Sequence, residues 1–298
     1  MSDAKYHTNL KFMHYKWLYF GISLAVLIPG LISLVLFKLK PAIDFTGGTL
    51  LEIKSAQPIE TAKFFDLAKE QHLELSSVQT SQDNTYLLRL KPISAEQNEE
   101  LKKSLGDVEE KRFETVGPVV GKELTQKALL AIGIASLAIV VYIAYAFRQV
   151  PKPYSPWKFG LSAVVALLHD ALVVLGIFSL LGHFLGVEID ALFVTAMLTV
   201  IGFSVHDTIV VFDRVRENLP KMADKSFEEV VDFSLSETLV RSLNTSFTVI
   251  LTLVALMLFG GETIRWFVAA LLIGIVSGTY SSIFNASPLL VIWESKKR

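Results

Sequence analysis

Long apolar runs alternate with short polar connections along the chain, and one polar segment is much longer than the rest. Each apolar run is about 20 residues long, the length of helix that crosses a hydrocarbon core about 30 Å thick. The pattern predicts a membrane α-helical protein with six transmembrane helices, at 17–37, 127–147, 159–181, 191–212, 243–260 and 266–288. The long polar segment, 38–126, lies between the first two helices and predicts a separate domain.

A secretory signal peptide is the alternative interpretation of the first apolar run. Signal peptides have apolar regions of about 7–15 residues, followed by a cleavage site of small residues. The run at 17–37 is longer, and Lys38-Leu39-Lys40-Pro41 follows it without such a site. We therefore expect an uncleaved first membrane helix.

The polar segment has the pattern of a small α+β domain. Pro58 and Ser94 precede stretches with helical spacing, and Ser94 is a candidate N-cap with Gln97 three residues later. The predicted order is strand 50–54, helix 58–71, strands 73–80 and 84–91, helix 94–105 and strand 108–116. This β-α-β-β-α-β order is that of a ferredoxin-like unit.

Basic residues are distributed unequally between the two sides of the predicted membrane domain. Short loops rich in Lys and Arg stay in the cytoplasm. One side carries Arg265, whereas the other carries Lys5, Lys11, Lys16, Arg148, Lys152, Lys158, Arg214, Arg216, Lys221, Lys225, Arg241, Lys296, Lys297 and Arg298. We therefore expect the N-terminus (1–16), the C-terminus (289–298) and the loop 213–242 in the cytoplasm, and the domain 38–126 in the periplasm.

Composition and motifs exclude several classes of protein. The net charge of -1 does not favour nucleic acid as a partner, and the absence of Cys excludes disulfides and thiolate metal sites. Zincin, Walker and Gly-x-Ser-x-Gly motifs are also absent. We therefore expect no catalytic site, no metal and no cofactor, and an energy supply from an ion gradient or a partner.

Two His-Asp pairs interrupt the apolar spans: His169-Asp170 near the middle of the third span, and His206-Asp207 in the fourth. Ionisable side chains at membrane depth are costly and usually line an ion or proton path. Asp213 is expected at the cytoplasmic boundary, about 9 Å from Asp207 at 1.5 Å per residue. Three alternatives stay open: Asp207 is hydrated at a shorter span's end, Asp170 is an inert hydrogen-bonded acid, and both histidines are packing residues.

Arg241 begins the fifth span at a depth similar to that of Asp207, so an ion pair between them is a hypothesis. If the guanidinium approached and withdrew, the acid would release and take up a proton in turn. The predicted proton relay comprises Asp207, Arg241, Asp213 and His206, and ordinary snorkelling of Arg241 to the interface is the alternative.

Two further patterns concern helix packing. Small residues recur every four positions in the sixth span, and Gly274, Gly278 and Ser282 are expected to let another helix approach closely. Residues 221–240 are amphipathic and predict a helix lying along the cytoplasmic interface, with a docking surface for a partner as the alternative.

Several motifs together are similar to those of the SecF family, the smaller half of the SecDF protein-export complex, which has a resistance-nodulation-division-type transporter fold. They are Ile43-Asp44-Phe45-Thr46-Gly47-Gly48-Thr49, Val116-Gly117-Pro118, His169-Asp170, the stretch from Asp207 to Asn218, and Arg241. One departure is His206, where most members of the family are expected to have Asn.

The resemblance implies an accessory subunit of the bacterial Sec translocase in the cytoplasmic (inner) membrane. SecD would supply the other six spans, the SecYEG channel and YajC would be further partners, and an unfolded preprotein would be the substrate. The proton gradient is the expected energy source, with sodium as an open alternative. Two other functions remain: an independent proton-coupled exporter of small molecules, and a membrane chaperone or scaffold whose buried acids are structural.

Overall fold

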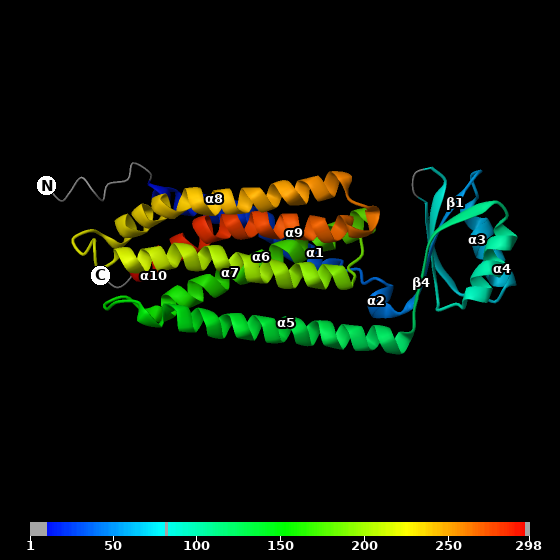
Figure 1. Cartoon of the computed structure of the whole chain (residues 1–298), viewed down its shortest axis with the longest axis horizontal. Helices are drawn as coiled ribbons and strands as arrows, with labels where there is room; N and C mark the ends of the chain where they lie inside the picture. Colours follow the sequence, from blue (N-terminus) through cyan, green and yellow to red (C-terminus); the bar gives the residue numbers. More distant parts are fainter. Residues whose placement is uncertain (1–10, 81–82, 296–298) are drawn as a thin grey trace. The chain divides into compact units, whose positions relative to one another are not determined.

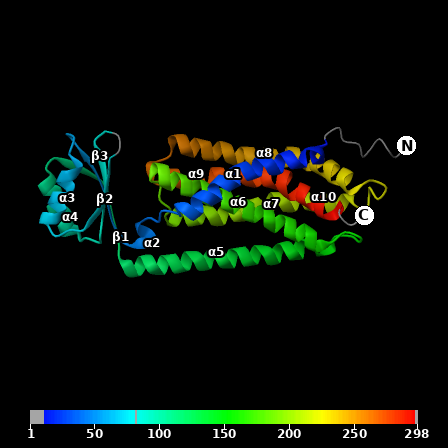
Figure 2. The same cartoon turned by 180° about the vertical axis from the view of Figure 1, so that it is seen from behind.

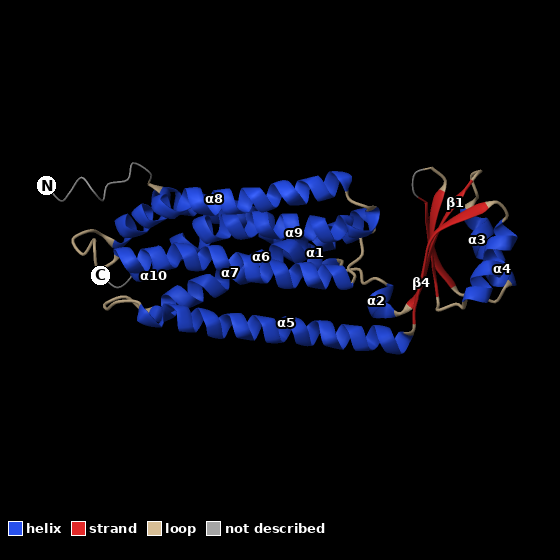
Figure 3. Cartoon of the chain, viewed as in Figure 1, coloured by secondary structure: helices blue, strands red, loops and turns tan. Residues whose placement is uncertain are grey.

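The computed structural model describes residues 11–80 and 83–295, and it divides into two compact units. The helical unit comprises 1–40 and 131–298, and the α+β unit comprises 41–130. Figures 1 and 3 show helices throughout the first and a sheet packed against helices in the second. The expected domain 38–126 therefore differs from the observed unit by a few residues at each end.

Six helices of the described residues are long and apolar enough to cross a membrane, as predicted. A short 3-10 helix, η2 (Phe12–Tyr15), leads into the first of them. The helices are α1 (Lys16–Leu36), α5 (Pro118–Ala146, extended by η3, Phe147–Gln149), α6 (Pro156–Leu185), α7 (Ala191–Asn218), α8 (Phe227–Phe259) and α9 (Glu262–Ser281). A π-helical turn, η4 (Ser282–Ala286), joins α9 to α10 (Ser287–Ser295), so these three form the sixth span.

Residues 213–242 were expected to connect two spans and to carry an amphipathic helix at 221–240; in the structure they are mostly helical and continue α7 and α8. α7 continues to Asn218 and α8 begins at Phe227, where Ser226 and Glu229 form a capping box. The amphipathic stretch expected along the interface is thus the first half of one continuous helix. Its apolar residues pack into the core of the bundle rather than against lipid headgroups, which explains their helical spacing.

The helical unit has two apolar cores, one near each end. The first contains Phe147, Phe159 and Phe212 from three helices, and it lies where α6 and α8 begin. The second contains Phe178 and Phe193, near the opposite end. Buried polar residues of α6, α7, α8 and α9 lie between these two clusters.

α1 and α6 lie side by side and cross at a pair of glycines (Figure 2). A Cβ atom added to Gly176 would lie 2.6 Å from the Cα atom of Gly30, so the two backbones are in direct contact. One turn later, the hydroxyls of Ser33 and Ser179 are 2.8 Å apart. Close backbone approach of this kind is how helices associate in lipid, where hydrophobic burial gives no driving force.

The α+β unit has the predicted ferredoxin-like order. A short helical turn, α2 (Ile43–Thr46), precedes its elements, which are β1 (Gly48–Ser55), α3 (Thr61–Glu70), β2 (Leu75–Thr80), β3 (Thr85–Leu90), α4 (Ala95–Leu105) and β4 (Val108–Val116). The strands pair antiparallel in the order β2-β3-β1-β4. Ser94 and Gln97 form the expected capping box at the start of α4.

The double glycine before β1 is required by the turn that it makes. Gly47 and Gly48 have φ angles of +72° and +130°, a region that side chains strongly disfavour. A Cβ atom would also lie 2.9 Å from the backbone of Pro118 at the first position and of Leu90 at the second. The pair therefore allows the starts of β1 and α5 to approach each other.

We predict that Gly176→Ala lowers the free energy of unfolding of the protein in detergent by about 1–3 kcal/mol, because a methyl group must force α1 and α6 apart. Gly133→Ala in α5 is the control, since no atom lies within 4 Å of its added Cβ. Thermal unfolding followed by tryptophan fluorescence measures both. Equal stability of the two variants would show that the glycine contact does not hold the helices together.

Candidate functional site

Asp170 is the centre of the polar layer between the two apolar cores. Its side chain is completely buried on α6. Ser204 of α7 donates to Oδ2 at 2.6 Å, and from α9 Ser281 donates to Oδ2 at 2.6 Å and Ser277 to Oδ1 at 2.7 Å. His169 Nδ1 lies 3.0 Å from Oδ1. One carboxylate therefore joins three helices through hydroxyl groups, and its hydrogen-bonding capacity is well used.

A second set of contacts connects this carboxylate to α1. His169 Nε2 lies 3.4 Å from Asn285 Nδ2 in the π-helical turn. Asn285 Oδ1 accepts a hydrogen bond of 2.8 Å from Ser23 of α1. The π-helical turn precedes Pro288, which cannot donate a backbone hydrogen bond, and such turns are frequent where a helix is adapted to a functional contact. The His169-Asp170 pair thus has polar neighbours on both sides.

Asp207 is the second buried acid, with 2% of the residue exposed. Its contacts are longer: Ser246 of α8 donates to Oδ2 at 3.4 Å, and His206 Nδ1 lies 3.4 Å from Oδ1. Ser246 in turn accepts a hydrogen bond of 2.6 Å from Thr279 of α9. Because 59% of the His206 side chain is exposed, this histidine joins the buried carboxyl group to the surface of the bundle.

The structure does not bring Arg241 to Asp207. Within the described residues, Arg241 is exposed and makes no ion pair with this acid. The reason is helical geometry: Arg241 precedes Ser246, which does contact Asp207, by five residues. Five residues correspond to about 7.5 Å along the helix and a rotation of about 140° to another face.

Asp213 lies at the end of α7, on the partly exposed surface. Its carboxylate pairs with Arg216 at 2.7 Å, one turn along the same helix. Its neighbour Arg214 instead binds Glu237 of α8 through two nitrogens, at 2.7 and 2.8 Å. Asn218 donates to the same glutamate at 2.8 Å. These contacts hold the end of α7 against α8, while Asp213 contacts neither Asp207 nor the polar layer.

The three small residues expected to pack a helix, Gly274, Gly278 and Ser282, lie on the side of the sixth span that faces α7. A Cβ atom at Gly274 would lie 2.1 Å from a methyl group of Val200, and one at Gly278 would lie 3.2 Å from Ser204. Ser282 is completely buried, and its hydroxyl is 2.8 Å from that of Thr208. This close approach is what allows Ser277 and Ser281 to reach Asp170.

Exposed residues, all polar except Gly202, form a stripe on α7 and another on α8. The residues are spaced by four, three and four positions: Thr195, Thr199, Gly202 and His206 on α7, and Arg241, Thr245, Thr248 and Thr252 on α8. Asp207 and Ser246 contact each other across the two helices. His206 directly precedes Asp207, and Thr245 directly precedes Ser246. A step of one residue rotates the side-chain direction by about 100° about the helix axis. Because α7 and α8 are antiparallel, the residues before Asp207 and before Ser246 therefore point to the same side of the helix pair. The two stripes therefore form one polar face, which we call the α7–α8 face.

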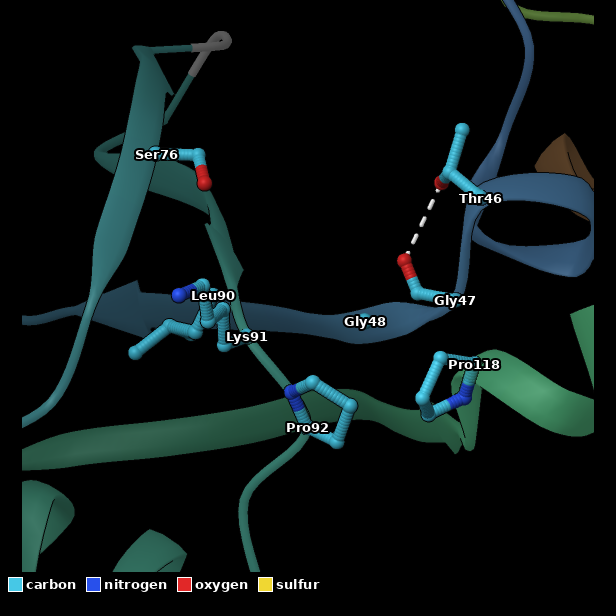
Figure 4. A pocket seen from close by; sticks show the side chains of 8 residues that line it. All are labelled: Thr46, Gly47, Gly48, Ser76, Leu90, Lys91, Pro92 and Pro118. Carbon is cyan, nitrogen blue, oxygen red and sulfur yellow. Dashed lines mark hydrogen bonds between the residues drawn. The ribbon is translucent and has the colours of Figure 1, made fainter.

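A hollow of about 430 Å³ lies in the α+β unit (Figure 4). Ser76 lies on one side of it, and Thr46 and Pro118 lie on the other. The remaining lining residues are Gly47, Gly48, Leu90, Lys91 and Pro92. In the described part of the chain, no cluster of three His, Asp or Glu side chains is arranged to hold a metal ion.

Sequence reasoning found the acids but missed the side chains that bind them. Ser204, Ser277 and Ser281 around Asp170, and Ser246 and Thr279 beside Asp207, were not expected. Hydroxyl residues are common in membrane helices, where they bond to the preceding turn, so they stand out little. The available signal was the spacing of Ser277 and Ser281, which places both on one face of the helix.

The fold and site define a class: a membrane protein of six helices, with buried acids in the helical unit and a ferredoxin-like unit after the first helix. The family model described as "Protein export membrane protein SecD/SecF, C-terminal" matches residues 96–296, and "SecD/SecF GG Motif" matches 32–59. The chain belongs to this SecD/SecF family of protein-export membrane proteins.

Individual relatives agree. The protein translocase subunit SecF of Thermobaculum terrenum is 50% identical, over 95% of this chain and 94% of the relative. SecDF of Bacillus subtilis is 33% identical, and the match covers 94% of this chain but 37% of that protein. The crystal structure of SecDF from Thermus thermophilus superposes with a TM-score of 0.81 at 31% identity, covering 99% of this chain and 40% of that one.

We predict that Asp170→Ala lowers the free energy of unfolding by about 2 kcal/mol or more, because three buried serine hydroxyls and His169 lose their acceptor. Asp213→Ala is the matched control, since its ion pair with Arg216 is partly exposed and such pairs contribute about 1 kcal/mol or less. Thermal unfolding in detergent measures both. Similar losses for the two variants would mean that the serine contacts do not stabilise the bundle.

Proposed function

We propose that this chain is an accessory subunit of the bacterial Sec protein translocase, which works with SecD to assist export of preproteins at the expense of the proton gradient. The proposal rests first on family membership and on relatives named protein translocase subunit SecF. It rests second on a buried carboxyl group, Asp207, that reaches the surface of a membrane helix bundle through an exposed histidine. The second observation is the one that carries the mechanism.

SecD is the proposed partner for the α7–α8 face. In Bacillus subtilis and Thermus thermophilus the region similar to this chain is 37% and 40% of a longer protein named SecDF. An exposed Arg and His on membrane helices are costly against lipid, so a partner bundle or water is expected to cover them. The family resemblance extends the proposal to the SecYEG channel and YajC as further partners.

Asp207 is the proposed proton-binding group, and its weak contacts support this role. A proton can be exchanged only where a carboxyl group is reachable, and His206 provides that route at 3.4 Å. Arg241, which points elsewhere in this structure, would act by approaching the acid in a second conformation. Each proton that crosses the membrane supplies about 2.3 kcal/mol per 100 mV of membrane potential, enough to shift a two-state equilibrium substantially.

In the proposed topology the helical unit spans the bacterial inner membrane, and the α+β unit lies in the periplasm. α1, α6 and α8 begin at one end of the helical unit, where Lys16 pairs with Glu228 and Lys158 pairs with Glu294. Arg214 and Arg241 lie toward the same end. A concentration of basic residues at one end of the helices supports its cytoplasmic location by the positive-inside rule.

We predict that Asp207→Asn abolishes the part of preprotein export that depends on the proton gradient, while the complex with SecD still assembles. Asn has nearly the same shape but cannot bind and release a proton at neutral pH. Asp213→Asn is the control, because this acid lies at the end of α7 and contacts Arg216. Export into inverted membrane vesicles, with and without an imposed gradient, measures both variants.

Full gradient-dependent export with Asp207→Asn would contradict the proton-binding role and favour a structural role for the acid. If drug efflux rather than export were lost in a strain lacking the gene, the chain would be an independent exporter of small molecules.

A further inference from the structure

The two edges of the sheet in the α+β unit differ sharply in charge. The strand order leaves β2 and β4 as the edges. β4 carries five charged residues among its nine: Glu109, Glu110, Lys111, Arg112 and Glu114. β2 reads Leu-Ser-Ser-Val-Gln-Thr and carries neither a charge nor a proline. Charges and prolines are the usual means by which proteins prevent another chain from pairing with an edge strand, and β2 lacks both.

The charges on β4 are held in place by ion pairs. Lys102 of α4 binds Glu110 at 2.7 Å, and Arg112 binds Glu114 at 2.7 Å. The hydrogen bond from Lys102 holds the pKa of Glu110 below its usual value, so this acid is ionised at neutral pH. An extended chain added to β4 would have to desolvate these pairs. The β4 edge is therefore closed to strand addition.

The β2 edge continues into the hollow at the end of the sheet. Ser76 is the unpaired residue of a bulge in β2, between Leu75 and Ser77, and its side chain also lines the hollow (Figure 4). Among the described residues, β2 pairs with β3 alone. Its outer backbone groups are thus directed away from the sheet, next to a hollow large enough for one or two side chains.

We infer that β2 binds an extended segment of polypeptide as a fifth strand, with a side chain of that segment seated in the hollow. This inference rests on the proposed function, in which an unfolded preprotein passes this unit. Strand addition uses main-chain hydrogen bonds for affinity and pockets for individual side chains. An edge without charges binds through the backbone and favours no particular sequence, which suits a site that must receive many different unfolded chains.

The test uses the full chain in its complex with SecD and a secretory preprotein stalled during export. A photo-reactive amino acid replaces Thr80 on the β2 edge or, as the matched position, Lys111 on the β4 edge; both side chains are exposed. We expect cross-links to the preprotein from position 80 and few from position 111.

Two double variants, which add the same number of lysines at different places, then test whether strand addition is the mechanism. Ser77→Lys with Gln79→Lys places two charges on the β2 edge, and cross-linking from position 80 should fall about fivefold. Ala56→Lys with Gln57→Lys adds the same charge in the exposed turn after β1 and should leave cross-linking unchanged. Thermal unfolding of both double variants identifies any loss caused by misfolding.

The outcomes separate the two proposals. Cross-links from position 80 only to a second copy of this chain, none at all, or preprotein cross-links unaffected by the β2 lysines would overturn strand addition. The proposed function would still stand if gradient-dependent export remained sensitive to Asp207→Asn. If export were insensitive to that substitution as well, the coupling function would fail independently of β2.

Discussion

The Asp170 carboxylate is the constraint around which the helical unit is arranged. A buried charge in a membrane bundle is tolerated only when polar groups satisfy it, and here three serines from α7 and α9 and one histidine do so. Ser277 and Ser281 of α9 are positioned for this contact where glycines of the same helix pack closely against α7. Close glycine packing and the hydrogen bonds to Asp170 therefore occur at the same place in the bundle, where Gly278 lies beside both Ser204 and Asp170.

This layer divides the bundle into two apolar cores with different surroundings. The core where α6 and α8 begin is bordered by ion pairs such as Arg214–Glu237 and Lys158–Glu294, which join helices at their ends. The opposite core contains Phe178 and Phe193 and includes residues of the first half of α7. Interior layers of hydrogen bonds are directional, whereas apolar contacts can slide. If the helices changed their arrangement, the hydrogen bonds of the polar layer would therefore have to exchange partners.

The sequence predicted the elements better than their ends. Apolar runs of about 20 residues identify a membrane span, so all six helices were found. The same criterion ends a span where polar residues begin. It therefore separated the amphipathic helix predicted at 221–240 from the fifth span, although both belong to α8, whose polar residues face ion-pair partners such as Arg214. The ferredoxin-like order was predictable because caps and turns, such as Ser94 with Gln97, are local signals.

The site was predictable only as positions along the chain. Asp170 and Asp207 were identified because acids are rare in apolar runs, but their partners depend on which helices meet. Ser204 and Ser281 are 34 and 111 residues from Asp170, and no local pattern relates them. The expected contact between Asp207 and Arg241 was based on similar depth, which fixes the position along a helix but not the rotation about its axis.

The two acids are buried to a similar extent, with 0% of Asp170 and 2% of Asp207 exposed, yet they differ in their contacts. Asp170 accepts three hydroxyl hydrogen bonds of 2.6–2.7 Å, so a change in its charge would disturb three helices at once. Asp207 has one hydroxyl contact, at 3.4 Å, and an exposed histidine beside it. Under the proposed function one acid gains and loses a charge in each cycle, and such a group is unsuited to be the point that holds the bundle together. The proposal thus assigns a separate acid to each requirement: Asp207, six residues before Asp213 on α7, and Asp170, near the middle of α6.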